Sequence, residues 1–360
     1  MAGCIPELRI AAVRRVGSGT FSSVYVGVDV LGVRRAVKRS HEAKAGQLHP
    51  ELIHEVLYLR RLRRAPCIVG LMRLAHDETG VLCAIIDAGR VSLDRWLTEA
   101  VAKKRGSWRT RARRFAADVA FALAHCHDLG IVHRDVKPSN VVLRNGRAML
   151  IDFGAAADVG RVLDMRVGSL HFRPPETILG ETQCASPVDV FALGLLIHEV
   201  TTGRGIPGVV DSEFGQLIRT LGAFGRGEMD WAINLPDFQP SFPSIRGGAL
   251  VSETVATCCS PNPIERCTAR LAMRSLDANA DTRMDFDELS HSQVGWAMAV
   301  AGEGASLLDD YLARATHRVD SVECSHIALA AARISDYDLP DRGTEDHAAE
   351  HILIFDLSQK

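Results

Sequence analysis

The sequence lacks the cysteine patterns that mark zinc-binding and disulfide-stapled proteins. It contains nine cysteines, at positions 4, 67, 83, 126, 184, 258, 259, 267 and 324, and no two of them form a CxxC pair. Scattered cysteines argue against a zinc site and against a disulfide framework. We therefore expect reduced thiols, as in cytosolic or nuclear proteins.

Long hydrophobic runs and an excess of charge of one sign are also missing. The most apolar stretch, Val190–Val200, is too short to span a bilayer and includes His198 and Glu199, so a buried helix is expected there. Met1–Ile10 has no apolar run typical of a signal peptide. The net charge of −2 gives no strong indication of nucleic-acid or membrane binding. These features predict a cytoplasmic or nuclear protein.

The chain does contain a short segment with three chemically matched groups. Within Gly130–Asn140, Asp135, Lys137 and Asn140 place a carboxylate, an ammonium and a carboxamide on one loop. Phosphoryl transfer from ATP needs a group that orients the attacking hydroxyl, a cation for the γ-phosphate and a magnesium ligand. Twelve residues after Asn140, Asp152-Phe153-Gly154 offers a second metal-binding carboxylate.

In this order and spacing the two motifs resemble those of eukaryotic protein kinases. The resemblance implies an α+β, bilobal protein kinase fold over residues 8–291, with a small β-rich N-lobe at about 8–88 and a helical C-lobe at about 89–291. It implies a serine/threonine kinase that uses ATP and Mg²⁺ on protein substrates. In that reading Asp135, Lys137, Asn140 and Ser169 are catalytic, and Asn140 and Asp152 bind the metal.

The N-terminal part of the chain supports the same resemblance. Val16–Val24 looks like a glycine-rich phosphate loop in which Ser22 replaces the third glycine. Lys38 resembles the strand lysine that pairs with the ATP phosphates. The resemblance implies that ATP is bound by Val16, Gly17, Ser18, Gly19, Val24, Ala36, Lys38, Glu55, Ile86, Asp87 and Gly89.

Lys38 needs a carboxylate partner, and the helical apolar pattern of Pro50–Leu62 carries two candidates. Glu55 is preferred over Glu51, because the residues after Glu55 match the family pattern for its helix αC. Val81–Ile86 is expected to be a buried strand, followed by an adenine-binding hinge in which Ile86 guards the back of the pocket.

Arg134 directly precedes the expected catalytic aspartate. Kinases with this arginine generally need a negative charge on the activation segment, often a phosphothreonine. The corresponding position here is Asp164, and no Ser, Thr or Tyr lies between Asp152 and Ser169. Asp164 is therefore expected either to supply a permanent charge to Arg134 or to face solvent as an ordinary loop residue.

Two further family positions are structural. Asp189 matches the aspartate that braces the catalytic loop, and Glu176 matches the glutamate that ends the activation segment. Arg283 is expected to pair with Glu176, with Arg266 as the second candidate.

The segments Asp211–Gly222 and Leu235–Pro243 resemble cyclin-dependent kinases, which implies membership of the CMGC group and a role in the cell cycle. Such kinases favour a proline after the target Ser or Thr. The glycine loop and Gly130–Asn140 also resemble the S-phase kinases that fire replication origins, which would favour acidic sites. The stretch His49–Glu55 keeps little of the cyclin-contact motif, so a cyclin or another activator remains an open partner.

Three alternatives stay open at this stage. A pseudokinase scaffold would usually lack one of Lys38, Asp135, Asn140 and Asp152, all of which are present. Asp277–Glu288 resembles a calcium-binding loop but has Thr282 where glycine is required. Residues 292–360 are expected to form a helical extension, with a cyclin-box-like remnant as the other possibility.

Overall fold

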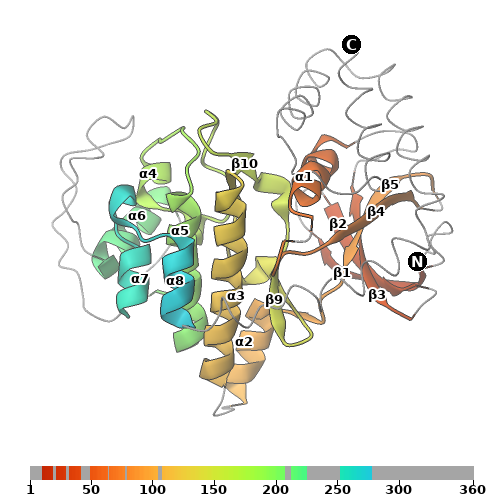
Figure 1. The fold of residues 1–360 in the computed structure, drawn as a ribbon, viewed down its shortest axis with the longest axis horizontal. Helices are drawn as coiled ribbons and strands as arrows, with labels where there is room; N and C mark the ends of the chain where they lie inside the picture. Colours follow the sequence, from red (N-terminus) through yellow and green to blue (C-terminus); the bar gives the residue numbers. More distant parts are fainter. Residues whose placement is uncertain are drawn as a thin grey trace, which may run out of the picture. The chain divides into compact units, whose positions relative to one another are not determined.

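The computed structural model describes residues 10–18, 22–29, 32–41, 49–63, 65–77, 79–103, 108–206, 212–224 and 252–277. The chain divides into two compact units. The first comprises 1–63, 70–88 and 287–360, and the second comprises 64–69 and 89–286. Both units are drawn in Figure 1, and each is described by itself. The tail at 292–360 lies outside the described residues.

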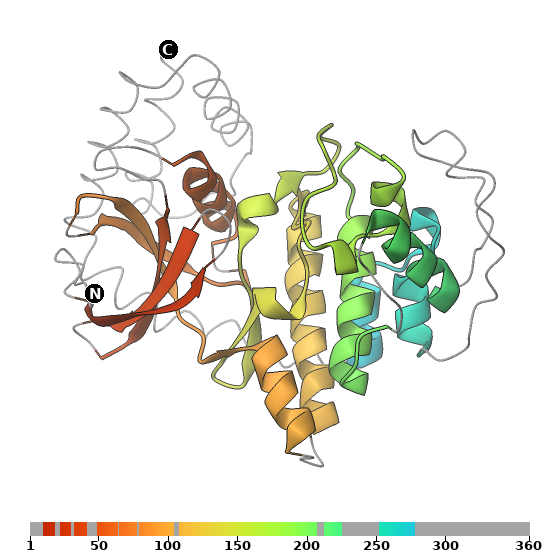
Figure 2. The same ribbon diagram turned by 180° about the vertical axis from the view of Figure 1, so that it is seen from behind.

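The first unit is built on a five-stranded antiparallel sheet with the strand order β1-β2-β3-β5-β4. Helix α1 accompanies the described part of this sheet in both ribbon views (Figures 1 and 2). The elements are β1 (Ala11–Ser18), β2 (Ser22–Val28), β3 (Arg34–Ser40), α1 (Pro50–Arg61), β4 (Leu71–His76) and β5 (Leu82–Asp87).

The two faces of this sheet bury different sets of residues, because side chains alternate along each strand. Val37 and Ile85 face one way, into a cluster that also contains Ile10, Ala75 and Cys83. Ala84 faces the other way and packs against Leu52 and Val56 of α1. The pattern of α1 explains this contact, since its apolar residues recur at helical spacing and are buried.

The second unit is mostly helical and has α3 at its centre. This helix packs against α5, α8 and the small sheet strand β9, and it runs beside α5 in both ribbon views. The helices are α2 (Leu93–Ala102), α3 (Trp108–Asp128), α4 (Pro175–Ile178), α5 (Pro187–Thr202), α6 (Glu213–Phe224), α7 (Glu253–Cys258) and α8 (Ala269–Leu276).

The loops of the second unit contain short strands and 3₁₀ turns. Two small antiparallel sheets form, one of β6, β8 and β9 and one of β7 and β10. The strands are β6 (Val91–Ser92), β7 (Ile131–Val132), β8 (Val141–Arg144), β9 (Arg147–Leu150) and β10 (Ala157–Asp158); the 3₁₀ turns are η2 (Pro138–Asn140), η3 (Phe153–Ala155), η4 (Leu170–Phe172) and η6 (Pro263–Glu265).

Helix α5 confirms the buried helix expected at Val190–Val200, and most of its residues are buried. Because it is apolar on nearly every side, it lies inside the helical unit rather than on its surface. Within the described parts of the chain, we find no helix with the length and apolar character that crossing a membrane requires.

Candidate active site

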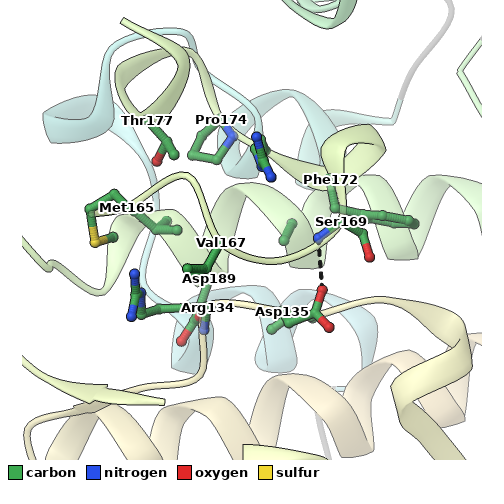
Figure 3. A pocket seen from close by; sticks show the side chains of 13 residues that line it. Arg134, Asp135, Met165, Val167, Ser169, Phe172, Pro174, Thr177 and Asp189 are labelled. Carbon is green, nitrogen blue, oxygen red and sulfur yellow. Dashed lines mark hydrogen bonds between the residues drawn. The ribbon is translucent and has the colours of Figure 1, made fainter. Parts of the chain in front are cut away.

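The catalytic-loop residues expected from the sequence lie together in the second unit. The ammonium of Lys137 donates to Asp135 Oδ2 and to Ser169 Oγ, both at 2.7 Å. The backbone N–H of Ser169 donates to Asp135 Oδ1 at 2.9 Å, a contact drawn in Figure 3. Both carboxylate oxygens of Asp135 are therefore held, and its side chain is fixed in one orientation.

Asn140 completes this group from the 3₁₀ turn η2. Its amide nitrogen donates to the backbone oxygen of Asp135 at 2.9 Å and to Asp135 Oδ2 at 2.8 Å. With the nitrogen used in this way, the amide oxygen is the atom that can bind a cation, and amide oxygens are suitable Mg²⁺ ligands. The second expected metal ligand, Asp152, has a left-handed backbone with φ 66°.

The residues next to Asp152 are anchored in the interior. Phe153 is fully buried, and its ring packs edge-on against His133 with the ring centres 4.7 Å apart. His133 also contacts the backbone oxygen of Ile151 through Nε2 at 3.0 Å. These contacts connect the Asp152 segment to the catalytic loop within one unit.

Asp189 braces the catalytic loop from the first turn of α5, as the sequence predicts. Its carboxylate accepts the backbone N–H groups of His133 and Arg134, both at 2.8 Å, and contacts His127 Nε2 at 3.0 Å. Complete burial would raise the pKa of Asp189, but the hydrogen bonds and charges of His127 and His133 outweigh it and lower the pKa below 3.8. His127 is a bracing residue that the sequence patterns did not single out.

Arg134 reaches residue 164 through the backbone of that residue. Its guanidinium donates to the backbone oxygen of Asp164 and, at 3.2 Å, to that of Ala155. The exposed carboxylate of Asp164 accepts the backbone N–H of Arg166 at 2.8 Å. Arg134 and Asp164 are therefore in contact through the main chain of Asp164, and the regulatory role of its charge stays a prediction.

The loop that follows contains a glycine whose role the sequence did not reveal. Gly168 has φ +77°, and a Cβ there would lie 2.5 Å from the backbone oxygen of Arg134. The backbone oxygen of Gly168 accepts a hydrogen bond from Arg173 at 3.0 Å. The only sequence signal was the placing of a glycine immediately before Ser169.

A pocket lies beneath this loop, between the catalytic loop and α5 (Figure 3). It is lined by Arg134, Asp135, Val136, Met165, Val167, Ser169, Phe172, Arg173, Pro174, Thr177, Val188, Asp189 and Ala192. Helix α6 supports its rim. Glu213 accepts from Arg173 at 2.7 Å, and the amide of Gln216 donates to the backbone oxygens of His171 and Arg173.

Glu176 has a different partner from the one we expected first. Arg266 binds it through two parallel hydrogen bonds of 2.6 and 2.7 Å, and both side chains are buried. The preferred pairing with Arg283 is therefore wrong, and the second candidate is the partner. Arg283 itself lies outside the described residues. Two parallel bonds from a planar guanidinium give this pair a defined geometry.

The expected lysine–glutamate pair is present in the first unit. Lys38 Nζ lies 2.5 Å from Glu55 Oε2, so Glu55 and not Glu51 is the partner. Glu51 instead contacts His49 at 2.6 Å. Strand register places Val24 and Ala84 opposite Lys38, and Ile86 opposite Ala36, so these residues share one face of the sheet.

The remaining expected ATP-binding residues are placed only in part. Val16 and Gly17 lie near the end of β1, where Gly17 pairs with Val24, and Ser18 is the last residue of that strand. Gly19 lies outside the described residues. Gly89 begins the longer segment of the second unit, where it fits closely against Val142.

Asp87 has a structural role that the sequence patterns did not indicate. Its carboxylate and that of Asp29 both contact the buried Arg35, at 3.2 and 2.8 Å. The N–H of Asp87 donates to the backbone oxygen of Gly70 at 3.0 Å. This buried ion-pair network fixes the end of β5, where the hinge is expected.

No cluster of three or more potential metal-binding side chains occurs among the described residues. The calcium-loop alternative is not addressed by this observation, since residues 278–288 of that loop lie outside the described residues. Asp277, its first residue, follows the end of α8.

A comparison with protein families agrees with this geometry. A family model described as the protein kinase domain matches residues 10–276, from the start of the described sheet to the last residue of α8. The sequence had suggested boundaries of 8 and 291. The match covers well over half of the 360 residues and includes the antiparallel sheet, the catalytic loop and the bracing helix. The chain belongs to the protein kinase family, and its fold is the bilobal α+β protein kinase fold.

Proposed function

We propose that the protein is an active serine/threonine kinase that transfers the γ-phosphate of ATP to protein substrates. The observation that carries this proposal is the contact set of Asp135, Lys137, Asn140 and Ser169. Asp135 is oriented to accept the proton of an attacking hydroxyl, which is the role of the catalytic-loop aspartate in phosphoryl transfer. Lys137 bridges Asp135 and Ser169 and so couples the substrate loop to the catalytic loop.

The proposal includes Mg²⁺, held by the amide oxygen of Asn140 and the carboxylate of Asp152. When bound, the metal would neutralise phosphate charge. The donor set fits a hard cation, since both ligands are oxygens. Lys38, paired with Glu55, is proposed to contact the ATP phosphates.

A phosphorylation assay with radiolabelled ATP and a broad peptide set tests this function. We expect transfer to Ser and Thr acceptors but not to Tyr. Asp135→Asn and Asp152→Ala should abolish transfer, while Ser169→Thr, which keeps the hydroxyl, should retain more activity than Ser169→Ala. A purified, folded protein that transfers no phosphate would indicate a scaffold instead.

We further propose a cyclin-dependent-kinase-like preference for proline after the target residue. The backbone oxygen of Gly168 already accepts a hydrogen bond from the charged Arg173, which makes it a weaker acceptor for an N–H of the substrate. Proline has no N–H, so it loses nothing at this position, whereas other residues leave a donor unpaired.

Peptides that differ only in Pro, Ala or Asp after the target serine would test this preference. We expect the highest kcat/KM for Pro. A preference for Asp would instead favour the origin-firing type of kinase. Running the assay with and without added cyclins would show whether such an activator is needed.

A further inference from the structure

Two cysteines beside helices α7 and α8 lie in direct contact. Cys258 is the last residue of α7, and Cys267 lies between Arg266 and Thr268, which caps α8. Their sulfur atoms are 3.4 Å apart, and both thiols are free. A disulfide has an S–S distance of about 2.0 Å, so only a small approach separates this pair from a bond.

The backbone keeps the two sulfurs near each other. The N–H of Cys267 donates to the backbone oxygen of Thr257 at 3.3 Å. Between the cysteines, Arg266 donates to the backbone oxygen of Ser260 at 2.8 Å and to that of Pro261 at 3.2 Å. The loop therefore folds around Arg266 and returns Cys267 to the end of α7.

The two thiols differ in access and in acidity. Cys258 is buried, whereas Cys267 is partly exposed. The hydrogen bond between the two sulfurs lowers the pKa of Cys267 to about 6, against the raising effect of burial. The same contact raises the pKa of Cys258, because one proton is shared between two sulfurs. The greater exposure of Cys267 and the lowering of its pKa both favour it as the nucleophile of the pair.

We propose that Cys267 and Cys258 form a peroxide-sensitive pair that closes reversibly to a disulfide. The Cys267 thiolate attacks one oxygen of hydrogen peroxide, the O–O bond breaks, and sulfenic acid and hydroxide form. The Cys258 thiol then attacks the Cys267 sulfur, and the S–O bond breaks with release of water. Two thiols are oxidised and one peroxide is reduced. A dithiol reductant restores the pair by exchange.

Closure would tie together the loop that carries Arg266. That residue holds Glu176 at the end of the activation segment. A cross-link restricts the unfolded chain, so the oxidised protein should have the higher Tm. This inference does not depend on phosphate transfer, and its readouts are mass and Tm.

Peptide mapping of the peroxide-treated full-length chain tests the pair. Trypsin cleaves after Arg246, Arg266 and Arg270, so Cys267 lies on peptide 267–270 and Cys258 on peptide 247–266. We expect these two peptides to be linked, with the loss of two hydrogens, and to separate on adding dithiothreitol. Fragment spectra should place the bond at Cys258 and not at Cys259.

Cys259 is the matched control, because its thiol points elsewhere and donates to the backbone oxygen of Phe191 at 3.5 Å. Cys259→Ser should keep the link and the rise in Tm, whereas Cys258→Ser and Cys267→Ser should lose both. If Cys258→Ser does not fold, the wild-type and Cys259→Ser spectra still locate the bond. A bond to Cys259, or oxidation of Cys267 to sulfinic acid with no link, would overturn the proposal.

Discussion

Gly168 occupies a backbone position that a side chain would disturb in two ways. Its φ of +77° is unfavourable for other residues, and an added Cβ would lie 2.5 Å from the backbone oxygen of Arg134. Relief of that contact would move Arg134 or Ser169, and Ser169 holds Asp135, the proposed catalytic aspartate. The geometry of the site around Ser169 therefore depends on residue 168 being a glycine.

We expect Gly168→Ala to lower kcat/KM for peptide phosphorylation by about tenfold or more, since a left-handed alanine costs about 1–2 kcal/mol before the steric clash is counted. Gly160→Ala is the matched control, because Gly160 has φ +81° with nothing within 4 Å of the added Cβ. Steady-state kinetics and Tm should be measured for both. Equal loss of activity in the two variants would refute a role for the close contact.

Substitution of Asp164 can separate the effect of its carboxylate charge from the effect of its backbone oxygen. Because Arg134 binds the backbone oxygen of Asp164, Asp164→Ala keeps the acceptor. We expect this variant to retain kcat/KM within about twofold, since exposed charges contribute little. Arg134→Met should lose activity. A large loss in Asp164→Ala, measured on the same peptide, would instead show that the carboxylate supplies the regulatory charge expected from the sequence.

At the scale of the element, α5 contributes most through the residue at its start. Asp189 accepts two backbone N–H groups of the catalytic loop and contacts His127. Because its folded-state pKa lies below 3.8, its stabilising effect is complete above that value and is lost as the pH falls through the folded-state pKa.

Asp189→Asn tests this contribution. We expect the variant to be less stable by about 1–3 kcal/mol at neutral pH, because a charged acceptor of several hydrogen bonds is replaced by a weaker one. The difference in unfolding free energy from the wild type should shrink as the pH is lowered from about 5 towards 3. Urea unfolding at several pH values measures it. A difference that grows on acidification would contradict the lowered pKa.

The short helix α4 is tied to the loop before α8 by Glu176 and Arg266. Breaking a buried ion pair leaves one charge without its partner, which typically costs about 3–5 kcal/mol. We expect Arg266→Met to cause such a loss of unfolding free energy. Arg283→Met is the matched comparison, and a smaller loss is expected there, because Arg266 already holds Glu176. Denaturant unfolding measures both losses. A larger loss for Arg283→Met than for Arg266→Met would support the pairing of Glu176 with Arg283 that was first expected from the sequence.

At the scale of the whole molecule, the sequence predicted contacts whose partners lie in recognisable local motifs. Asp135, Lys137 and Asn140 share one loop, and Lys38 with Glu55 lies on a strand and a helix whose patterns were both clear. The fold followed from these motifs, because they occur in the order that the kinase family requires.

The partner of Glu176 was harder to predict, because the sequence offered two candidate arginines and spacing along the chain does not fix distances in space. The contact between Arg134 and Asp164 shows a second limit. The pattern located the two residues, but only the backbone conformation determines that a carbonyl rather than a carboxylate is bound. No sequence motif indicated the buried ion-pair network around Arg35.

Binding of ATP with Mg²⁺ gives a test of the proposed function that does not require turnover. A ligand at about one hundred times its Kd stabilises the folded state by about 2.7 kcal/mol, which corresponds to a rise in Tm of about 3–5 °C for a protein of this size. We expect this rise for the wild type in ATP and Mg²⁺. Lys38→Met should show a much smaller shift, since the paired ammonium of Lys38 is the proposed phosphate contact.

Removing Mg²⁺ from the assay tests the roles of Asn140 and Asp152, its two proposed ligands, apart from those of the other site residues. Chelation with EDTA should reduce the shift caused by ATP, and Asp152→Asn should reproduce that reduction with Mg²⁺ present. Tm should be measured by thermal scans for the wild type, Lys38→Met and Asp152→Asn, with ATP and with ADP as ligands. A shift that is the same with and without Mg²⁺ would mean that Asn140 and Asp152 do not hold a metal, because the added cation would then contribute nothing to binding.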